Sequence, residues 1–303
     1  MPLPNFFIIG APKAGSTALY DTLAQHPQIY MSPVKEPLFF ACEGEPPLLS
    51  GPLVTFLRRR AIWRRPEYLA LFEGVKEERA IGEASVVYLR SPQAASRIQR
   101  NIPGAKLVAV LRHPAERAHS HFWFSVQQGI DLARSFEEAL EQEANGGREG
   151  WFSGLHHREN GFYFRQFAAY YALFAREQIK VYLYEEWQTD PRALLRDLFQ
   201  FLEVEADFAP ILRRSNVTAV PRSRRFQAWA HHPQRLEARL NGVVPRTLHK
   251  PFVAGMQAAN LRFNQGKVPP LSSHTRAHLV QDYREDVLAL QQLIQRDLSH
   301  WLT

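Results

Sequence analysis

The chain has 303 residues, 45% of them hydrophobic, with a formal net charge of +7 and one cysteine. That length and apolar content suffice for a sizeable core in one large α/β domain or two smaller ones. The lone Cys42 excludes a disulfide within the chain and fits a reducing compartment such as the cytoplasm. No apolar run reaches about 18 residues, so we expect no membrane span, and the positive charge favours an anionic partner.

Short apolar runs predict strands, and longer periodic stretches predict helices. In chain order, the pattern predicts a strand over 6–9, a helix over 16–25, a strand over 80–82, a helix over 92–101, a strand over 107–111, helices over 114–128, 135–145 and 162–176, a strand over 180–184, and helices over 191–203, 233–241 and 273–297. Strands that alternate with helices indicate βαβ units. We therefore expect an α/β fold with a central parallel sheet flanked by helices on both faces.

Three segments break this alternation because they are rich in Pro, Gly or Arg: 43–66, 145–161 and 213–225. Long irregular segments in compact domains are often lids or binding loops. The C-terminal stretch 274–302 is predicted as a long amphipathic helix that packs against the sheet.

The most informative segment is the loop after the first predicted strand, Gly-Ala-Pro-Lys-Ala-Gly-Ser-Thr at 10–17. A strand, a glycine-bounded loop and a helix start form a cradle in which backbone N–H groups converge on an anion. A nucleotide triphosphatase has its lysine after the second glycine, followed by a hydroxyl that binds Mg²⁺. Here Lys13 lies inside the loop and Ser16 follows Gly15 directly. The spacing predicts a phosphate loop and argues against ATP hydrolysis.

A second anion site is predicted at the end of the strand 107–111. Arg112 follows that strand, and Ser120 lies eight residues later on the next helix. Ligands bind at the carboxyl ends of parallel strands, and the planar fork of arginine binds phosphate oxygens bidentately. No acidic residue ends this strand to hold Mg²⁺. Two separate phosphate sites imply a ligand with phosphates at two ends.

With these two sites, the sequence resembles the sulfotransferases that use 3′-phosphoadenosine 5′-phosphosulfate (PAPS), especially the heparan-sulfate-type and bacterial branch. The loop with its internal lysine is similar to the family's 5′-phosphosulfate loop, and Arg112 with Ser120 is similar to its 3′-phosphate site. Further matches are KEPLFF (35–40), GEASVVYL (82–89), GFYFRQFAAYY (161–171) and RDLSHWL (296–302). The resemblance implies a single sulfotransferase domain over 1–303 with a P-loop-like fold.

The resemblance also implies the reaction: transfer of a sulfuryl group from PAPS to an acceptor hydroxyl or amine, with no metal required. Such transfer needs positioning and charge stabilisation. Lys13 is the candidate to stabilise the bridging oxygen as negative charge grows there. Glu83 is the candidate general base, because it follows the strand 80–82 and would lie at the same sheet edge as Lys13. Lys35 either reaches the sulfonate, orients Glu83, or pairs with a carboxylate such as Glu36.

The resemblance assigns ten residues to the nucleotide: Ala14, Gly15, Ser16, Thr17, Arg112, Ser120, Tyr163, Arg222, Ser223 and Arg224. Tyr163 begins a helix that is expected beneath the nucleotide. The last three occupy the place of a Lys-Gly-Arg loop of the family, although the glycine is missing. The family's lysine after the base is Ala84 here, so acceptor binding need not match that of the glycan enzymes.

The acceptor is left open, since a glycan, a lipid or small metabolite, and a β-hydroxyacyl chain on an acidic carrier protein all suit a basic surface. Segments 43–66 and 145–161 are expected to wall its cleft. Two other functions compete, besides a PAPS-fold protein that lacks catalytic activity and belongs to a larger assembly. A kinase or another P-loop nucleotide triphosphatase needs a lysine after Gly15 and a carboxylate for Mg²⁺. A nucleic-acid-binding module is allowed by the arginines at 58–65 and 213–225 but has no recognised motif, so nucleic acid is not expected.

Histidines are frequent in two places. His113, His119 and His121 crowd one segment, and His156 and His157 form a pair. None has a zinc-site spacing with acidic or cysteine partners, so no metal site is expected. We predict that His156 and His157 are surface residues, with a role in acceptor binding as the alternative.

Overall fold

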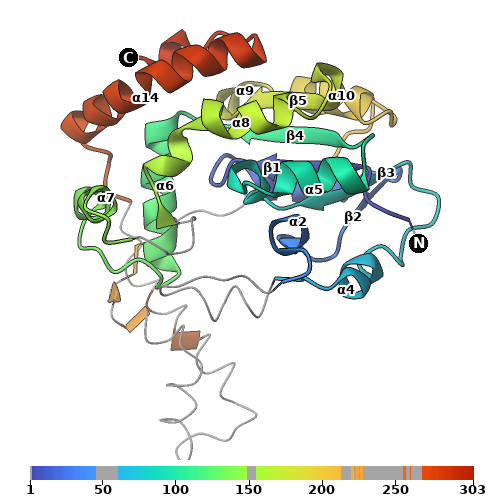
Figure 1. Cartoon of the computed structure of the whole chain (residues 1–303), viewed down its shortest axis with the longest axis horizontal. Helices are drawn as coiled ribbons and strands as arrows, with labels where there is room; N and C mark the ends of the chain where they lie inside the picture. Colours follow the sequence, from blue (N-terminus) through green and yellow to red (C-terminus); the bar gives the residue numbers. More distant parts are fainter. Residues whose placement is uncertain are drawn as a thin grey trace, which may run out of the picture.

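The computed structural model describes residues 2–45, 61–148, 155–212 and 268–303, together with 220, 221, 223, 224, 226, 227, 255, 256 and 260. In this part of the chain, five strands form one parallel sheet in the order β2-β3-β1-β4-β5 (Figure 1). They are β1 (Phe6–Gly10), β2 (Ile29–Met31), β3 (Ala80–Ala84), β4 (Lys106–Leu111) and β5 (Ile179–Leu183). The predicted parallel sheet is confirmed.

The described α-helices are α1 (Ser16–Leu23), α2 (Phe39–Cys42), α4 (Arg65–Ala70), α5 (Ala94–Asn101), α6 (Pro114–Gln127), α7 (Phe136–Ala144), α8 (Tyr163–Tyr171), α9 (Tyr184–Thr189), α10 (Pro191–Phe201) and α14 (Ser273–Ile294). Short 3₁₀ turns are η1 (Tyr88–Arg90), η3 (Glu159–Gly161), η4 (Arg176–Gln178) and η6 (Ser299–Trp301). None of the described helices is long and apolar enough to span a membrane. The predicted helix 233–241 lies outside the described residues.

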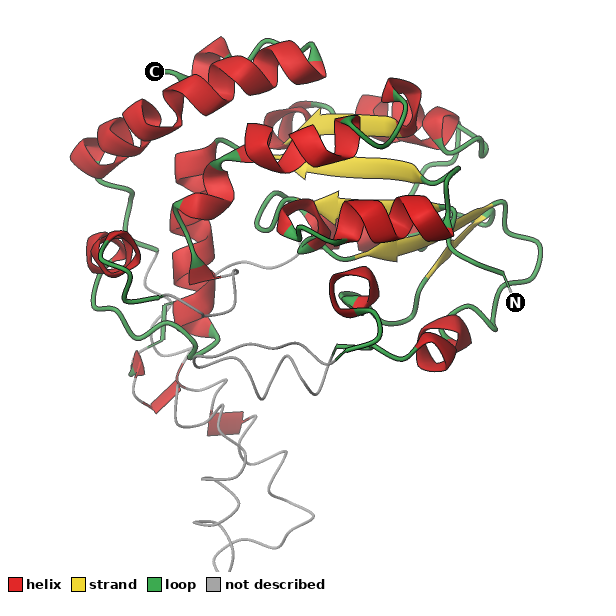
Figure 2. Ribbon diagram, in the orientation of Figure 1, coloured by secondary structure: helices red, strands yellow, loops and turns green. Residues whose placement is uncertain are grey.

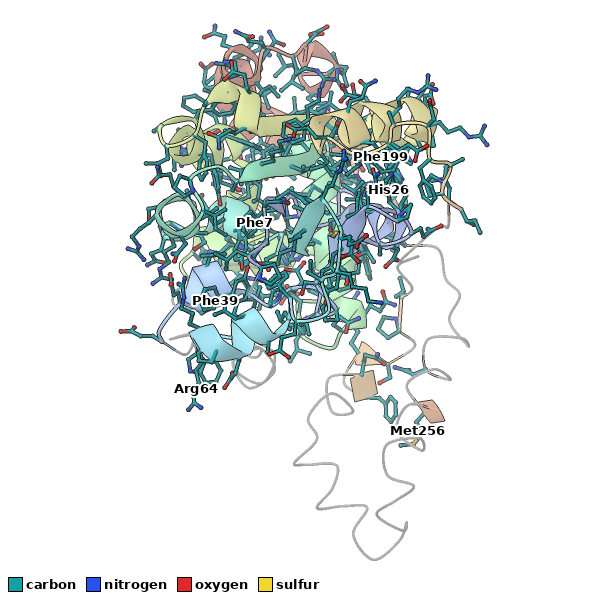
Figure 3. The ribbon with its side chains drawn as sticks, turned by 90° about the vertical axis from the view of Figure 1, so that its right-hand side faces the viewer. Phe7, His26, Phe39, Arg64, Phe199 and Met256 are labelled. Atoms are coloured by element: carbon teal, nitrogen blue, oxygen red, sulfur yellow. The ribbon has the colours of Figure 1, made fainter. Side chains whose placement is uncertain are left out.

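Helices cover both faces of the sheet, as predicted (Figure 2). α5 and α8 lie on the face that is in front in Figure 1. On the other face, His26, which follows α1, lies beside Phe199 of α10, with ring centroids 4.7 Å apart (Figure 3). The strands between these layers read as continuous apolar runs because both of their faces are buried. All five residues of β1 are buried, and Phe7 lies in the core (Figure 3).

Local sequence explains where several helices begin. Ser135 accepts a hydrogen bond from Glu138 N at 3.1 Å at the start of α7, and Ser272 accepts one from Thr275 N at 3.1 Å at the start of α14. Such caps are typically worth about 1 kcal/mol. α6 begins at Pro114, where the missing N–H of proline has no intrahelical partner to lose.

The helices α2, α4 and α9 were not predicted, and two further elements differ from the sequence predictions. The strand β2 was missed because three residues are too few to show a pattern. β2 pairs with β3 through Ile29 and Ala80, and it carries the chain towards Lys35. The helix α14 packs mainly against α8 and α6, and the predicted stretch reaches the sheet through Arg296, which donates to the carbonyl of Val181 at 3.1 Å (Figure 1). The reason is that other helices already cover both faces of the sheet.

Candidate active site

The loop between β1 and α1 has the backbone shape of an anion site. Lys13 and Gly15 both have positive φ angles, 67° and 94°. Glycine is favoured in that left-handed region because it lacks a Cβ atom. Ala11 N donates to the carbonyl of Val110 at 2.7 Å, which anchors the loop to the end of β4.

The start of α1 supplies the donors of this loop. Gly15 is its N-cap residue, and no side chain caps the helix. The N–H groups of a first helical turn have no intrahelical partner, so those near Ser16 and Thr17 are free to bind an anion. Ala14 is fully buried, and its N–H donates to the carbonyl of Ala11 at 3.3 Å, so it holds the shape of the loop. The four residues predicted for the 5′-phosphosulfate therefore form one helix start.

Arg112 follows β4 and lies against the same loop. Its Nη1 donates to the carbonyl of Lys13 at 3.4 Å, and its guanidinium lies 5.0 Å from the ring centre of Tyr184. Glu116, one turn into α6, has its Oε2 4.0 Å from Nη2 of Arg112. The two predicted phosphate sites are thus neighbours, as a nucleotide with phosphates at both ends requires.

The electrostatics of Lys13 indicate a site built for an anion. Burial, followed by the charges of Arg112 and Lys35, lowers the pKa of Lys13 to about 8. Its Nζ lies 4.2 Å from the ring centre of Phe124. A bound polyanion would replace the lost hydration and offset the repulsion among the three cations. The residues present therefore fit a nucleotide that carries several negative charges.

Tyr163 and Ser120 occupy different environments. Tyr163 is fully buried, and its hydroxyl donates to the carbonyl of Arg112 at 3.0 Å. Tyr163 therefore holds the backbone of Arg112 in position. Ser120 is partly exposed on the second turn of α6, two turns beyond Arg112.

The basic segment 213–225 is described in part. Arg224 lies 5.1 Å from the ring centre of Trp123 on α6 and donates to the carbonyl of Ala133. Ser223 N donates to Asn260 at 2.9 Å. These contacts bring Arg224 to the helix that carries Ser120. Arg222 lies outside the described residues, as do 46–60 and 149–154, so the two cleft walls stay a prediction.

The sequence indicated that Glu83 follows its strand, but Glu83 lies inside β3. β3 continues to Ala84, because Phe7 pairs with Glu83 and Ile8 with Ala84 in parallel register. The Glu83 carboxylate is fully buried. It accepts hydrogen bonds from the hydroxyls of Tyr68 at 2.6 Å and Ser85 at 2.7 Å. Burial raises the pKa of Glu83 to about 7, although these hydrogen bonds oppose the shift.

Lys35 pairs with Glu36, the third of the roles considered for it. The Nζ of Lys35 lies 3.1 Å from Oε1 of Glu36, and the Glu36 side chain is 30% exposed. The backbone of Glu36 has a φ of 61°, and its N–H donates to the carbonyl of Ala84 at 2.9 Å. Such strained residues cluster at functional sites. Sequence reasoning considered Glu36 only as a partner of Lys35, although it stands inside the KEPLFF motif.

Five side chains form a ring of neighbours: Lys13, Lys35, Glu36, Arg90 and His121. The charge of Lys35 acts on Lys13, and Lys35 is bonded to Glu36. Burial lowers the pKa of Arg90 to about 10, and the charge of Glu36 opposes that shift. Burial, and charges that include Arg90 and Lys13, lower the pKa of His121 well below its usual range. The ring therefore couples side chains from four segments of the chain to Lys13.

One histidine prediction is wrong. His157 is fully buried and not a surface residue. Its Nε2 bonds the Asp131 carboxylate at 2.9 Å, and its carbonyl accepts a hydrogen bond from Arg117. No cluster of three or more metal-ligating side chains was found among the described residues.

The comparison with known families agrees with this geometry. The family described as "Sulfotransferase domain" matches residues 3–230. The chain therefore belongs to the sulfotransferase family of group-transfer enzymes, and the predicted resemblance is confirmed.

Individual relatives support the same family. The solved structure of a sulfotransferase from Alicyclobacillus acidocaldarius is 31% identical, with a TM-score of 0.78 over all of both chains. The membrane-associated sulfotransferase kil1 of Dictyostelium discoideum is 30% identical over 148 residues, which is 47% of this chain and 28% of that protein. Carbohydrate sulfotransferase 15 of Homo sapiens is 30% identical over 179 residues, 46% of this chain and 31% of that protein. The chain spans less than a third of the length of these two curated relatives.

Proposed function

We propose that the chain transfers a sulfuryl group from PAPS to an acceptor hydroxyl or amine. The observation that carries this proposal is the position of Lys13, partly buried in an anion loop and next to Arg112. A triphosphatase loop has its lysine elsewhere. Bound PAPS would supply an activated sulfuryl group on a phosphate leaving group.

The donor is assigned to residues of two groups. The loop backbone at Ala14 and Gly15 and the helix start at Ser16 and Thr17 hold the 5′-phosphosulfate. Arg112, Ser120, Tyr163, Arg222, Ser223 and Arg224 serve the 3′-phosphate and adenine, with Tyr163 acting through Arg112. Support comes from the open start of α1 and from the hydrogen bond between Tyr163 and Arg112.

Lys13 is assigned to the bridging oxygen. In the transfer, the acceptor oxygen or nitrogen forms a bond to sulfur, and the bond from sulfur to the phosphate oxygen breaks. The leaving bisphosphate keeps the electron pair, and the ammonium of Lys13 stabilises that charge. A pKa of about 8 leaves Lys13 mostly protonated at neutral pH, and an adjacent anion raises that value.

A carboxylate takes the proton of the acceptor, and the described residues offer two candidates. Glu83 was predicted from the sequence, and its pKa of about 7 suits a base at neutral pH. Its carboxylate is, however, enclosed by Tyr68 and Ser85. Glu36 is partly exposed and bonded to Lys35, which neighbours Lys13. The exposure of Glu36 therefore favours it as the base that contacts the acceptor, and Glu83 stays the alternative.

Several classes of acceptor fit the proposed reaction. Carbohydrate sulfotransferase 15 is named for a carbohydrate acceptor, which supports testing a glycan first. A lipid, a small metabolite and an acyl chain on an acidic carrier protein remain on the same screen. A cytoplasmic location and the absence of a required metal stay predictions.

The first experiment is a thermal-shift comparison of adenosine 3′,5′-bisphosphate, AMP and ATP with Mg²⁺. A ligand at about a hundred times its Kd stabilises a fold by about 2.7 kcal/mol. We expect the bisphosphate to raise the melting temperature well beyond the other two. A larger shift with ATP and Mg²⁺, accompanied by ATP turnover, would support the nucleotide triphosphatase instead.

A further inference from the structure

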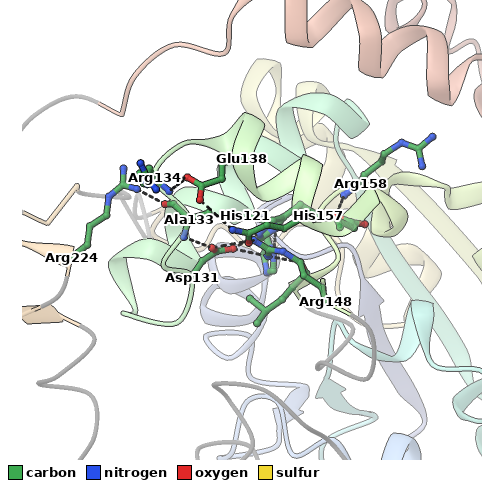
Figure 4. Close-up of polar contacts among 12 residues, drawn as sticks. His121, Asp131, Ala133, Arg134, Glu138, Arg148, His157, Arg158 and Arg224 are labelled. Atoms are coloured by element: carbon green, nitrogen blue, oxygen red, sulfur yellow. Dashed lines mark hydrogen bonds and ion pairs between the residues drawn. The ribbon is translucent and has the colours of Figure 1, made fainter. Parts of the chain in front are cut away.

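A buried chain of hydrogen bonds leads from Asp131 through His157 to His121 (Figure 4). Oδ2 of Asp131 lies 2.7 Å from Nη1 of Arg148 and 2.9 Å from Nε2 of His157. The two histidines meet through their Nδ1 atoms, 3.3 Å apart. Asp131, Arg148 and His157 are at most 2% exposed, whereas His121 is partly exposed. None of these four side chains is among the residues proposed to bind the nucleotide.

The direction of the bonds fixes the proton positions. Burial opposes ionisation of Asp131, but hydrogen bonds from His157 and Arg148 outweigh it and hold the pKa of Asp131 well below its usual range. An ionised carboxylate only accepts hydrogen bonds, so His157 donates from Nε2. Burial lowers the pKa of His157, which keeps that ring neutral with a bare Nδ1. His121 must then donate from its own Nδ1.

His121 is left with a bare nitrogen at Nε2. Burial, and then the charges of His157, Arg117 and Arg90, lower the pKa of His121, so its ring stays neutral. No bond to Nε2 is found within the described part of the chain. The ring of His121 lies 6.3 Å from that of Phe124, over which Nζ of Lys13 lies. His121 and Lys13 therefore both lie against Phe124, and the charge of Lys13 acts on the His121 ring.

We propose that Nε2 of His121 accepts a hydrogen bond from the acceptor molecule, and that His157 and Asp131 are positioning residues that fix its tautomer. This rests on the proposed sulfuryl transfer. A bare nitrogen rejects a carboxylate or sulfate and selects a group with an O–H or N–H donor. The acceptor therefore presents a hydroxyl, amine or amide beside Lys13, even though cations such as Arg90 stand nearby.

Two substitutions separate this role from a structural one. The amide of His121→Asn reaches the place of Nδ1, so it keeps the bond to His157 and loses the acceptor atom at Nε2. The amide of His121→Gln reaches the place of Nε2 and loses the buried bond. Transfer is measured with labelled PAPS and p-nitrophenol, n-octyl β-glucoside and a heparan sulfate oligosaccharide. The acceptor that the parent protein sulfates fastest is then used for both variants.

We expect His121→Asn to raise KM for that acceptor about tenfold or more, with nucleotide affinity and melting temperature near those of the parent. His121→Gln should keep KM within about threefold of the parent while melting earlier. The reverse order, with His121→Asn fully active, would show that the chain of bonds is structural and overturn the inference.

Nitrogen NMR of the imidazole rings gives a second test that needs no turnover. We expect the proton of His121 on Nδ1 and that of His157 on Nε2, and the opposite tautomers would overturn the inference. If the parent protein binds adenosine 3′,5′-bisphosphate and sulfates an acceptor, and His121→Asn has an unchanged KM, this inference alone is overturned. A parent protein that fails to bind the bisphosphate sinks the proposed function as well.

Discussion

The hydroxyl of Tyr163 donates a hydrogen bond of 3.0 Å to the backbone carbonyl of Arg112. This bond ties the first residue of α8 to the end of β4, where the guanidinium of Arg112 lies against the anion loop. Because Tyr163 is fully buried, it reaches a nucleotide only through that carbonyl. The motif that predicted a residue beneath the nucleotide therefore marks a support for Arg112, the residue proposed to bind the 3′-phosphate.

Tyr163→Phe removes that support without changing the packing of the ring. We expect affinity for adenosine 3′,5′-bisphosphate to fall about three- to tenfold, because a hydrogen bond of this kind is worth about 1 kcal/mol. Calorimetric titration measures it. Tyr170→Phe is the matched control, because the Tyr170 hydroxyl donates to the carbonyl of Tyr88 at 2.8 Å, away from Arg112. Equal loss of affinity in both variants would contradict the assignment.

Arg112→Ala tests which phosphate the arginine binds. A charge-assisted bond to a phosphate is worth about 1.5–3 kcal/mol, so the bisphosphate should bind about 10- to 100-fold more weakly. AMP lacks the 3′-phosphate, and its affinity should change less than about twofold. Both constants come from the same titration series. A parallel drop for AMP would move Arg112 to the 5′ site.

Lys13→Met should raise stability and abolish function together. The folded-state pKa of Lys13, about 8, lies below its usual 10.5, so the charge destabilises the fold most below pH 8, and that penalty disappears as the pH rises towards 10.5. The partly exposed side chain limits the gain at pH 7 to about 1–2 kcal/mol, measured by urea unfolding without nucleotide. PAPS turnover should fall about 10²- to 10³-fold. A less stable variant would refute this account of the site.

The fold was largely predictable because its strands are short apolar runs between long amphipathic helices. The loop at Lys13 and the strand end at Arg112 were found because their chemistry depends on neighbours in the sequence. The strand β2 escaped because its three residues pair with β3 only in the folded sheet. The sequence did not predict that α14 packs mainly against other helices. Sequence periodicity reports an apolar face but not what covers it.

Site residues that depend on long-range contacts were harder to predict. The end of β3 is set by its register with β1, so the sequence put Glu83 one step beyond its true place inside the strand. Glu36 was read only as a partner for Lys35, because its exposure and positive φ are properties of the fold. His157 looked like a surface residue because its partner, Asp131, is distant in sequence.

The enclosed carboxylate of Glu83 should make stability depend on pH. Its folded-state pKa of about 7 lies above the usual 4.5. Between these values the unfolded chain loses the proton first, so stability falls as the pH rises from 4.5 to 7 and levels off above it. The full difference corresponds to about 3 kcal/mol. Urea unfolding across this range should show a flatter profile for Glu83→Gln, and an unchanged profile would mean that Glu83 is ionised in the fold.

Activity then decides between the two carboxylates. Glu36→Gln keeps an oxygen for the N–H of Val86, which donates to the carboxylate at 3.2 Å, and removes the charge beside Lys35. Loss of a general base costs about 10²- to 10⁴-fold in rate. We expect that loss for Glu36→Gln and a decrease below about tenfold for Glu83→Gln, because only Glu36 is exposed to an acceptor. Nucleotide affinity, measured in both variants, separates a lost base from a damaged donor site. The opposite ranking would assign the proton to Glu83, and it would require Tyr68 or Ser85 to move aside when the acceptor binds.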